Sequence, residues 1–216
     1  MLQSPLMQND WATENLQTIR NLMERAALYR RAMAPMMIAV GVTGIAAAGL
    51  AWILKLEDDR VYVPFWMVVA AISMAEAFYF ARREALRQKE PLWSPPMRRV
   101  IQAMQPAFFA GLVLPVIFLG WARGENGAFL IAVLPLWLLL YGCGVHAAGF
   151  FMPRGFKLFG WCYVFCACSW WACFLTDELQ FVRDCNPNWL MGLFFGGGHL
   201  AYGIYLYCTE KRGNDS

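Results

Sequence analysis

Six long apolar stretches, separated by short polar segments, restrict the fold of this chain more than any other feature. They cover residues 33–54, 61–81, 104–121, 128–151, 156–176 and 189–207. Each is roughly 18 to 24 residues long, and a helix needs ~20 residues to cross ~30 Å of hydrocarbon. Backbone polar groups in lipid must be satisfied within the segment, and these segments are too long and too continuously apolar for barrel strands. The sequence therefore predicts an all-α integral membrane bundle of six transmembrane helices, without room for a soluble catalytic module.

The lysines and arginines fall unequally on the two sides of these stretches. If the first stretch runs outward, fourteen of the 18 basic residues face the cytoplasm: Arg20, Arg25, Arg30, Arg31, Arg82, Arg83, Arg87, Lys89, Arg98, Arg99, Arg154, Lys157, Lys211 and Arg212. The other four are Lys55, Arg60, Arg123 and Arg183. This positive-inside bias predicts a bacterial inner (cytoplasmic) membrane protein with N and C termini in the cytoplasm. The net charge of +3 follows from this topology, so we expect no nucleic-acid binding.

The polar segment before the first apolar stretch has a helical pattern of its own. Leu16, Ile19 and Met23 recur at helical spacing without an intervening Pro or Gly, which predicts an amphipathic helix on the cytoplasmic surface. This helix is either an interfacial anchor or an element that docks a partner or gates the bundle. The predicted organisation is a cytoplasmic segment with an amphipathic helix (1–31), a six-span transmembrane domain (32–208) and a cytoplasmic tail (209–216).

Three ionisable residues lie inside the apolar stretches: Glu76 in the second, His146 in the fourth and His199 in the sixth. Counting ~1.5 Å per residue from the inner ends places Glu76 and His146 each roughly 9 Å below the cytoplasmic boundary, and His199 about 13 Å below it. Ionisable residues in lipid usually face protein, water or each other. The three form a candidate intramembrane polar site, either for a proton or cation, or for hydrogen bonds that join helices.

Glycines gather in the first and last apolar stretches. Gly41, Gly44 and Gly49 in the first, and Gly192 and Gly196 in the last, let a neighbouring helix come close, so we expect them at helix-packing positions. Further glycines lie beside His199, and a distorted helix that exposes carbonyls to a substrate or ion is the alternative. The run is not a phosphate loop, because it lacks the lysine and follows no strand.

The cysteines and histidines give little support for a metal or cofactor. The seven cysteines are odd in number, and some of them lie in or near lipid, so they do not indicate a disulfide framework. A Cys173–Cys185 bridge near the outer face is the exception that stays open. Two histidines on separate helices could bind haem as a bis-histidine pair. For zinc, the one additional ligand near a histidine is Cys143, one turn before His146. We expect no metal, no cofactor and no catalytic residue.

Three segments taken together resemble a family of uncharacterised bacterial inner-membrane proteins with six helices. They are IRNLMER at 19–25, LLYGCGVHAAG at 139–149 and LMGLFFGGGHL at 190–200. The resemblance covers most of the chain from Glu14 to Tyr207. It implies a six-span fold, a regulatory association and no known reaction. His146 departs from the family pattern, in which that position is usually apolar, and this weakens a shared mechanism for Glu76, His146 and His199.

These observations predict a multi-pass membrane protein that is a non-enzymatic accessory or sensing component. Its partners are the lipid bilayer and a cytoplasmic protein, met by the amphipathic helix and the basic 82–99 loop. The first alternative is a small-solute or proton-coupled transporter that uses the intramembrane Glu and His residues. A haem-binding redox subunit is the remote alternative.

Overall fold

The computed structural model describes residues 33–87, 89, 91–121, 128–152, 154–175 and 185–214. Within them the chain forms the helix Met33–Ile53, α2 (Asp59–Arg87), α3 (Pro95–Trp121), α4 (Ala128–Ala148) and α5 (Arg154–Leu175). A last helix begins as α7 (Pro187–Met191), continues as the π-helical segment η1 (Gly192–Gly197) and ends as α8 (Gly198–Asn214). No strand occurs among these residues. The all-α prediction is confirmed for this part of the chain, whereas the amphipathic helix expected within 1–31 lies outside the described residues.

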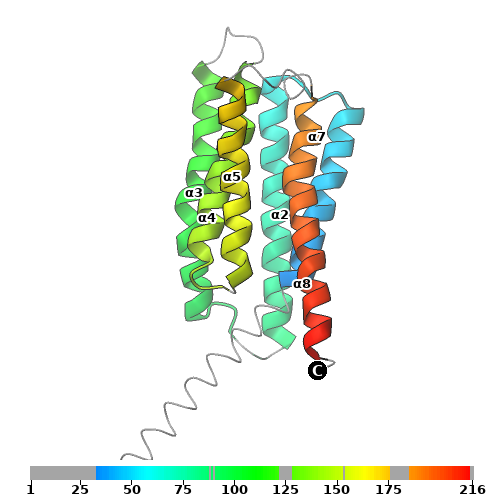
Figure 1. The fold of residues 1–216 in the computed structure, drawn as a ribbon, viewed down its shortest axis with the longest axis vertical. Helices are drawn as coiled ribbons and strands as arrows, with labels where there is room; N and C mark the ends of the chain where they lie inside the picture. Colours follow the sequence, from blue (N-terminus) through cyan, green and yellow to red (C-terminus); the bar gives the residue numbers. More distant parts are fainter. Residues whose placement is uncertain are drawn as a thin grey trace, which may run out of the picture.

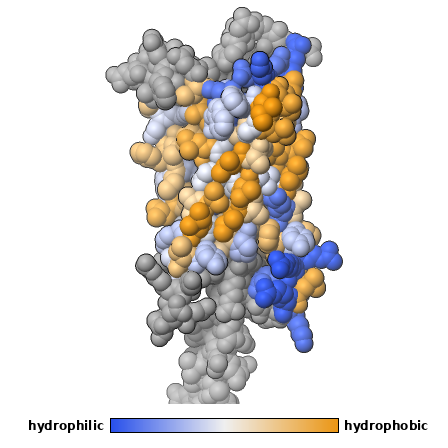
Figure 2. Space-filling model, turned by 90° about the vertical axis from the view of Figure 1, so that its right-hand side faces the viewer, coloured by the Kyte–Doolittle hydropathy of each residue, from blue (hydrophilic) through white to orange (hydrophobic). Residues whose placement is uncertain are grey.

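Three helices are long and apolar enough to cross a membrane: Met33–Ile53, Arg60–Arg87 and Met97–Leu119. A fourth apolar helix, Ala132–Ala148, is shorter. Large apolar side chains such as Ile53, Phe109 and Phe165 point outward and are mostly exposed. Figure 2 shows apolar side chains over the middle of one face, with hydrophilic residues gathered toward both ends. A soluble protein rarely presents so much contiguous apolar surface, so the apolar helices indicate a membrane location.

The helices lie side by side along the long axis of the molecule, and each runs opposite to the preceding one (Figure 1). In this view α3, α4 and α5 lie on one side, Met33–Ile53 and α7–α8 lie on the other, and α2 lies between them. The core includes fully buried Tyr62, Leu138 and Val145. Gly142 lets α4 approach α5, because a Cβ there would lie 2.8 Å from the carbonyl oxygen of Gly160.

The two ends of the bundle differ in their balance of positive and negative charge. The end of α2, the start of α3 and the turn from α4 to α5 lie at one end (Figure 1). We call this the basic end; its described basic residues are Arg82, Arg83, Arg87, Lys89, Arg98, Arg99 and Lys157. The opposite end carries both signs, in Lys55, Glu57, Asp58 and Arg60. The basic connection is shorter than the 82–99 loop expected from the sequence, because α2 continues to Arg87 and α3 begins at Pro95. Pro91 lies between the two helices, and Pro95 and Pro96 are the first residues of α3, where proline is tolerated.

Candidate functional site

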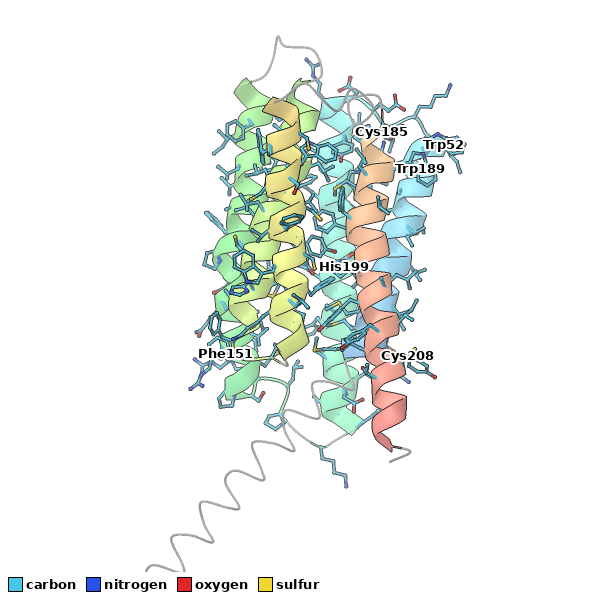
Figure 3. The ribbon with its side chains drawn as sticks, viewed as in Figure 1. Trp52, Phe151, Cys185, Trp189, His199 and Cys208 are labelled. Carbon is cyan, nitrogen blue, oxygen red and sulfur yellow. The ribbon has the colours of Figure 1, made fainter. Side chains whose placement is uncertain are left out.

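His199 lies at the centre of the bundle, where it joins three helices (Figure 3). Its Nε2 is 2.5 Å from the hydroxyl oxygen of Tyr141 on α4, and its Nδ1 is 2.5 Å from the carbonyl oxygen of Phe195. A carbonyl oxygen can only accept, so Nδ1 carries a hydrogen and donates it. In the neutral ring Nε2 then accepts from Tyr141. Both ring nitrogens are therefore used by the protein, and neither is open to a ligand in this arrangement.

Two backbone carbonyls of the π-helical segment accept side-chain hydrogen bonds beside His199. A π-turn carries one extra residue per turn and breaks the regular pattern of α-helical hydrogen bonds. The carbonyl of Phe195 accepts from His199 Nδ1, and the carbonyl of Phe194 accepts from the hydroxyl of Tyr163 on α5 at 2.8 Å. The last helix is thus distorted here, as in the alternative interpretation of its glycines, but the Phe194 and Phe195 carbonyls are bonded within the chain, to side chains and to the Gly198 backbone N–H.

Aromatic rings surround the His199 imidazole. The rings of Tyr141 and Phe159 have centroids 5.3 and 5.5 Å from that of the imidazole, and Phe195 stacks at 6.4 Å. Phe159 also stacks on Tyr202 at 4.4 Å. Such a shell excludes water and strengthens the hydrogen bonds inside it. Chemically, the arrangement is a set of buried hydrogen bonds that joins α4, α5 and the last helix.

Glu76 on α2 lies elsewhere and has a different partner. The Thr43 hydroxyl donates to Glu76 Oε1 at 2.7 Å, which ties α2 to the Met33–Ile53 helix. The other carboxyl oxygen, Oε2, is buried and accepts no hydrogen bond from any described residue. Buried polar atoms are usually bonded, so among the described residues this oxygen is a polar atom of the bundle interior that is open to a proton, cation or further donor.

His146 lies at the seam between α4 and α5, close to the basic end. Its ring sits between those of Phe150 and Trp161, with centroid distances of 5.5 and 5.4 Å. Its Nδ1 lies 3.5 Å from the Lys157 carbonyl oxygen, at the limit of a hydrogen bond. Among the described contacts, no hydrogen bond or ring contact joins any two of Glu76, His146 and His199.

Four of the five glycines expected at packing positions lie in one antiparallel contact between the Met33–Ile53 helix and the last helix. A Cβ at Gly41 would lie 2.5 Å from the backbone nitrogen of Leu200, and one at Gly44 would lie 2.8 Å from Gly196 Cα. A Cβ at Gly192 would meet that of Ala48 at 2.5 Å. Gly49 is different, because a Cβ there would meet nothing within 4 Å. It follows Ala48 by one position and faces away from the last helix.

A second buried polar cluster at the end opposite the basic end was not anticipated. Asn188 is fully buried; its Oδ1 accepts from Trp66 Nε1 at 2.9 Å and its Nδ2 donates to the Leu56 carbonyl at 2.8 Å. Asn186 caps α7 by accepting from the Asn188 backbone N–H, and its amide donates to Glu57. Trp66 is thus buried inside the bundle. The Asn-Pro-Asn sequence signals a helix cap but not the partners of Asn188.

The partners of His199 were also not identified from sequence. Tyr141 and Tyr163 occur in apolar stretches, where a tyrosine hydroxyl must find an acceptor, and that requirement is the signal that could have singled them out. The structure shows no disulfide among the described cysteines, so the Cys173–Cys185 bridge is not formed in it. Within the described part of the chain, no three His, Cys, Asp or Glu side chains lie close enough to hold a metal ion.

The fold and these contacts define a class: an all-helical protein whose apolar helices indicate a membrane location and whose interior is joined by a few buried hydrogen bonds. No family model, curated protein or solved structure matches this chain.

Proposed function

We propose that this chain is a six-span protein of the bacterial inner membrane, with both termini in the cytoplasm, that acts as a non-enzymatic accessory or sensing component. The proposal includes membership of the six-helix inner-membrane family that the three sequence segments resemble. Beside the three long apolar helices, α4, α5 and the last helix run the length of the same bundle (Figure 1). At ~1.5 Å per residue the last helix, from Pro187 to Asn214, is about 40 Å long, which is enough to cross a bilayer.

The unequal charge of the two ends is the observation that supports the proposed orientation. Among the side chains that the structure describes, the basic end has seven cations and one carboxylate, Glu84, which is 3.8 Å from Arg87. Positive residues are retained on the cytoplasmic side. At the opposite end Trp52 and Trp189 are half exposed and in ring contact at 5.8 Å (Figure 3). Exposed tryptophans there suit a membrane–water interface.

The orientation is tested with reporters that are active on one side of the membrane. A reporter fused after Ser216 should be active only when it is a cytoplasmic type, and one inserted at Asp58 only when it is a periplasmic type. The reverse pattern would refute the proposed sidedness. If the same type of reporter is active at both positions, the two positions lie on the same side of the membrane, and the odd number of spans proposed between them is refuted.

The interior of the bundle supports an accessory role more than a catalytic one. The hydrogen-bonding groups of His199 and Asn188 are satisfied by the protein itself, and satisfied buried networks make a core rigid and specific. A cytoplasmic partner would then meet the basic end and the 1–31 segment. Affinity purification in mild detergent, with the full chain and with residues 1–31 removed, tests this. Loss of a specific partner on truncation is expected, and identical partners for both forms, or none, would contradict docking.

A proton-coupled transporter is the second candidate, and Glu76 is the residue that favours it. One oxygen of this carboxyl is buried without a partner among the described residues, and intramembrane carboxyls of this kind occur in proton pathways. Reconstitution into liposomes that contain a pH dye tests this candidate directly. Flux that Glu76→Gln abolishes would support it, whereas flux unaltered by Glu76→Gln and His199→Ala would remove it.

A further inference from the structure

Two cations at the basic end lie against exposed aromatic rings of the turn between α4 and α5. The Nζ of Lys157 is 3.7 Å from the Phe150 ring centroid, and Arg99 Cζ is 6.0 Å from that of Phe151 (Figure 3 labels Phe151). Phe150 is 65% exposed and Phe151 45%. Among the described residues no carboxylate pairs with either cation. Their positive charge is therefore open to an anion from outside the protein.

The same surface carries two more polar groups without a protein partner. Trp161 is 56% exposed, and its indole N–H donates to none of the residues that the structure describes. His146, held between Phe150 and Trp161, has its Nε2 free of described hydrogen bonds. Lys157 and His146 thus lie against the exposed ring of Phe150, and Trp161 lies in ring contact with His146.

An exposed apolar strip leads from this cluster along the outside of α5. Lys157, Trp161 and Phe165 follow one another at intervals of four residues, so they lie on one face of the helix. Phe165 is 71% exposed, and Leu158, the residue after Lys157, is 67% exposed. The surface therefore changes from cationic at the end of the bundle to aromatic and then purely apolar toward its middle, which matches the order of headgroup, glycerol region and acyl chain in a phospholipid.

We propose that Lys157, His146, Phe150 and Trp161 form a binding site for an anionic phospholipid. The Lys157 ammonium binds the phosphate, the Trp161 indole and the His146 imidazole lie beside the glycerol region, and an acyl chain follows Trp161 and Phe165. Charge complementarity selects an anionic headgroup over a zwitterionic one. The exposed apolar strip selects a lipid over a soluble phosphate. The site depends on the membrane location of the protein and not on the accessory role proposed above.

The test is lipid binding to the full chain, purified in detergent and stripped of lipid, measured by native mass spectrometry. Dioleoyl phosphatidylglycerol should bind more tightly than dioleoyl phosphatidylcholine. Lys157→Gln keeps most of the side chain and removes its charge, and should weaken phosphatidylglycerol binding by about fivefold. Arg83→Gln is the matched control, because Arg83 is exposed at the same end and has no described ring contact; it should change binding by less than about twofold.

Equal weakening in the two variants would show that diffuse surface charge holds the lipid and would overturn the site. Unchanged binding in Lys157→Gln, or equal affinity for the two lipids, would also overturn it. Soluble glycerol 3-phosphate, added at the concentration of the lipid, should not displace phosphatidylglycerol, and displacement would refute the contribution of the acyl chain. Because binding is read on purified protein, a failed partner or orientation experiment leaves this result unaffected.

Discussion

At the scale of single residues, the interior depends on a few polar side chains that are fully bonded. His199 uses one nitrogen for Tyr141 and the other for the Phe195 carbonyl in the π-helical segment. Asn188 uses its amide oxygen and nitrogen for Trp66 and Leu56 in the same manner. In an apolar interior, each of these groups would be costly without its partner.

Replacing Tyr141 by Phe should destabilise the protein while leaving the ring packing intact. The substitution removes the donor to His199 Nε2, and hydrogen bonds between membrane helices are worth about 1 kcal/mol. Thermal unfolding in detergent, followed by size-exclusion chromatography, should show a lower midpoint. Tyr205→Phe is the control, because Tyr205 is exposed and keeps its ring contact with Tyr202. If the two variants unfold at the same temperature, the hydrogen bond between Tyr141 and His199 does not stabilise the protein.

The His199 geometry also predicts a tautomer. Nitrogen-15 NMR of the protein labelled at histidine should show His199 as a neutral ring with its hydrogen on Nδ1, because Nδ1 faces the Phe195 carbonyl. With two histidines in the chain, a His146→Gln variant assigns the signals. A hydrogen on Nε2 in the neutral ring would contradict the bonding described here.

At the scale of helices, the first and last described helices are joined by small residues. The contacts pair Gly41 with Leu200, Gly44 with Gly196 and Ala48 with Gly192, so the close approach continues over several turns. Lipid gives no hydrophobic drive for association between helices, and such contacts therefore depend on close backbone packing. The π-helical segment lies within the same stretch, so one region of the last helix both packs on the first helix and presents carbonyls to α5.

Gly196→Ala should disrupt this contact. The added Cβ would lie 2.6 Å from the backbone nitrogen of Ile45, which cannot move aside as a flexible side chain can, and overpacking of this kind costs about 1–3 kcal/mol. Gly49→Ala is the matched control on the first helix, since its Cβ would meet nothing within 4 Å and Ala favours a helix over Gly. The midpoint of thermal unfolding in detergent should fall for Gly196→Ala alone. A similar fall in both would mean that the crossing does not limit stability.

At the scale of the whole molecule, the exposed apolar surface separates a membrane protein from an aqueous one. Phe109 lies in an apolar window of α3 and is 68% exposed. In lipid, Phe109→Arg should reduce the membrane-inserted fraction, because an arginine near the helix centre costs ~2.5–3.5 kcal/mol on insertion scales. In water the same change would be tolerated. Carbonate extraction of membranes measures the inserted fraction, with Phe109→Leu as the control, and equal insertion of the two variants would contradict contact between this face and lipid.

The sequence by itself determined that the described chain is helical and that its apolar segments indicate a membrane. It did not determine every helix end, because α2 ends six residues after its apolar stretch, α3 begins nine residues before its own, and the last helix ends seven residues beyond its own. These properties depend on local composition: an apolar run of sufficient length, interrupted by proline or charge, leaves few alternatives. Glycines in the first and last apolar stretches likewise indicated a packing face, and four of the five expected positions lie in it.

The tertiary structure alone decided which side chains meet. Glu76, His146 and His199 lie in the inner half by counting residues, yet depth along a helix does not fix the direction in which a side chain points. His199 turns inward to Tyr141 and Tyr163, Glu76 turns to Thr43, and His146 turns to the seam with Trp161. These directions depend on how each helix is rotated about its axis, and that rotation depends on contacts between segments far apart in the chain.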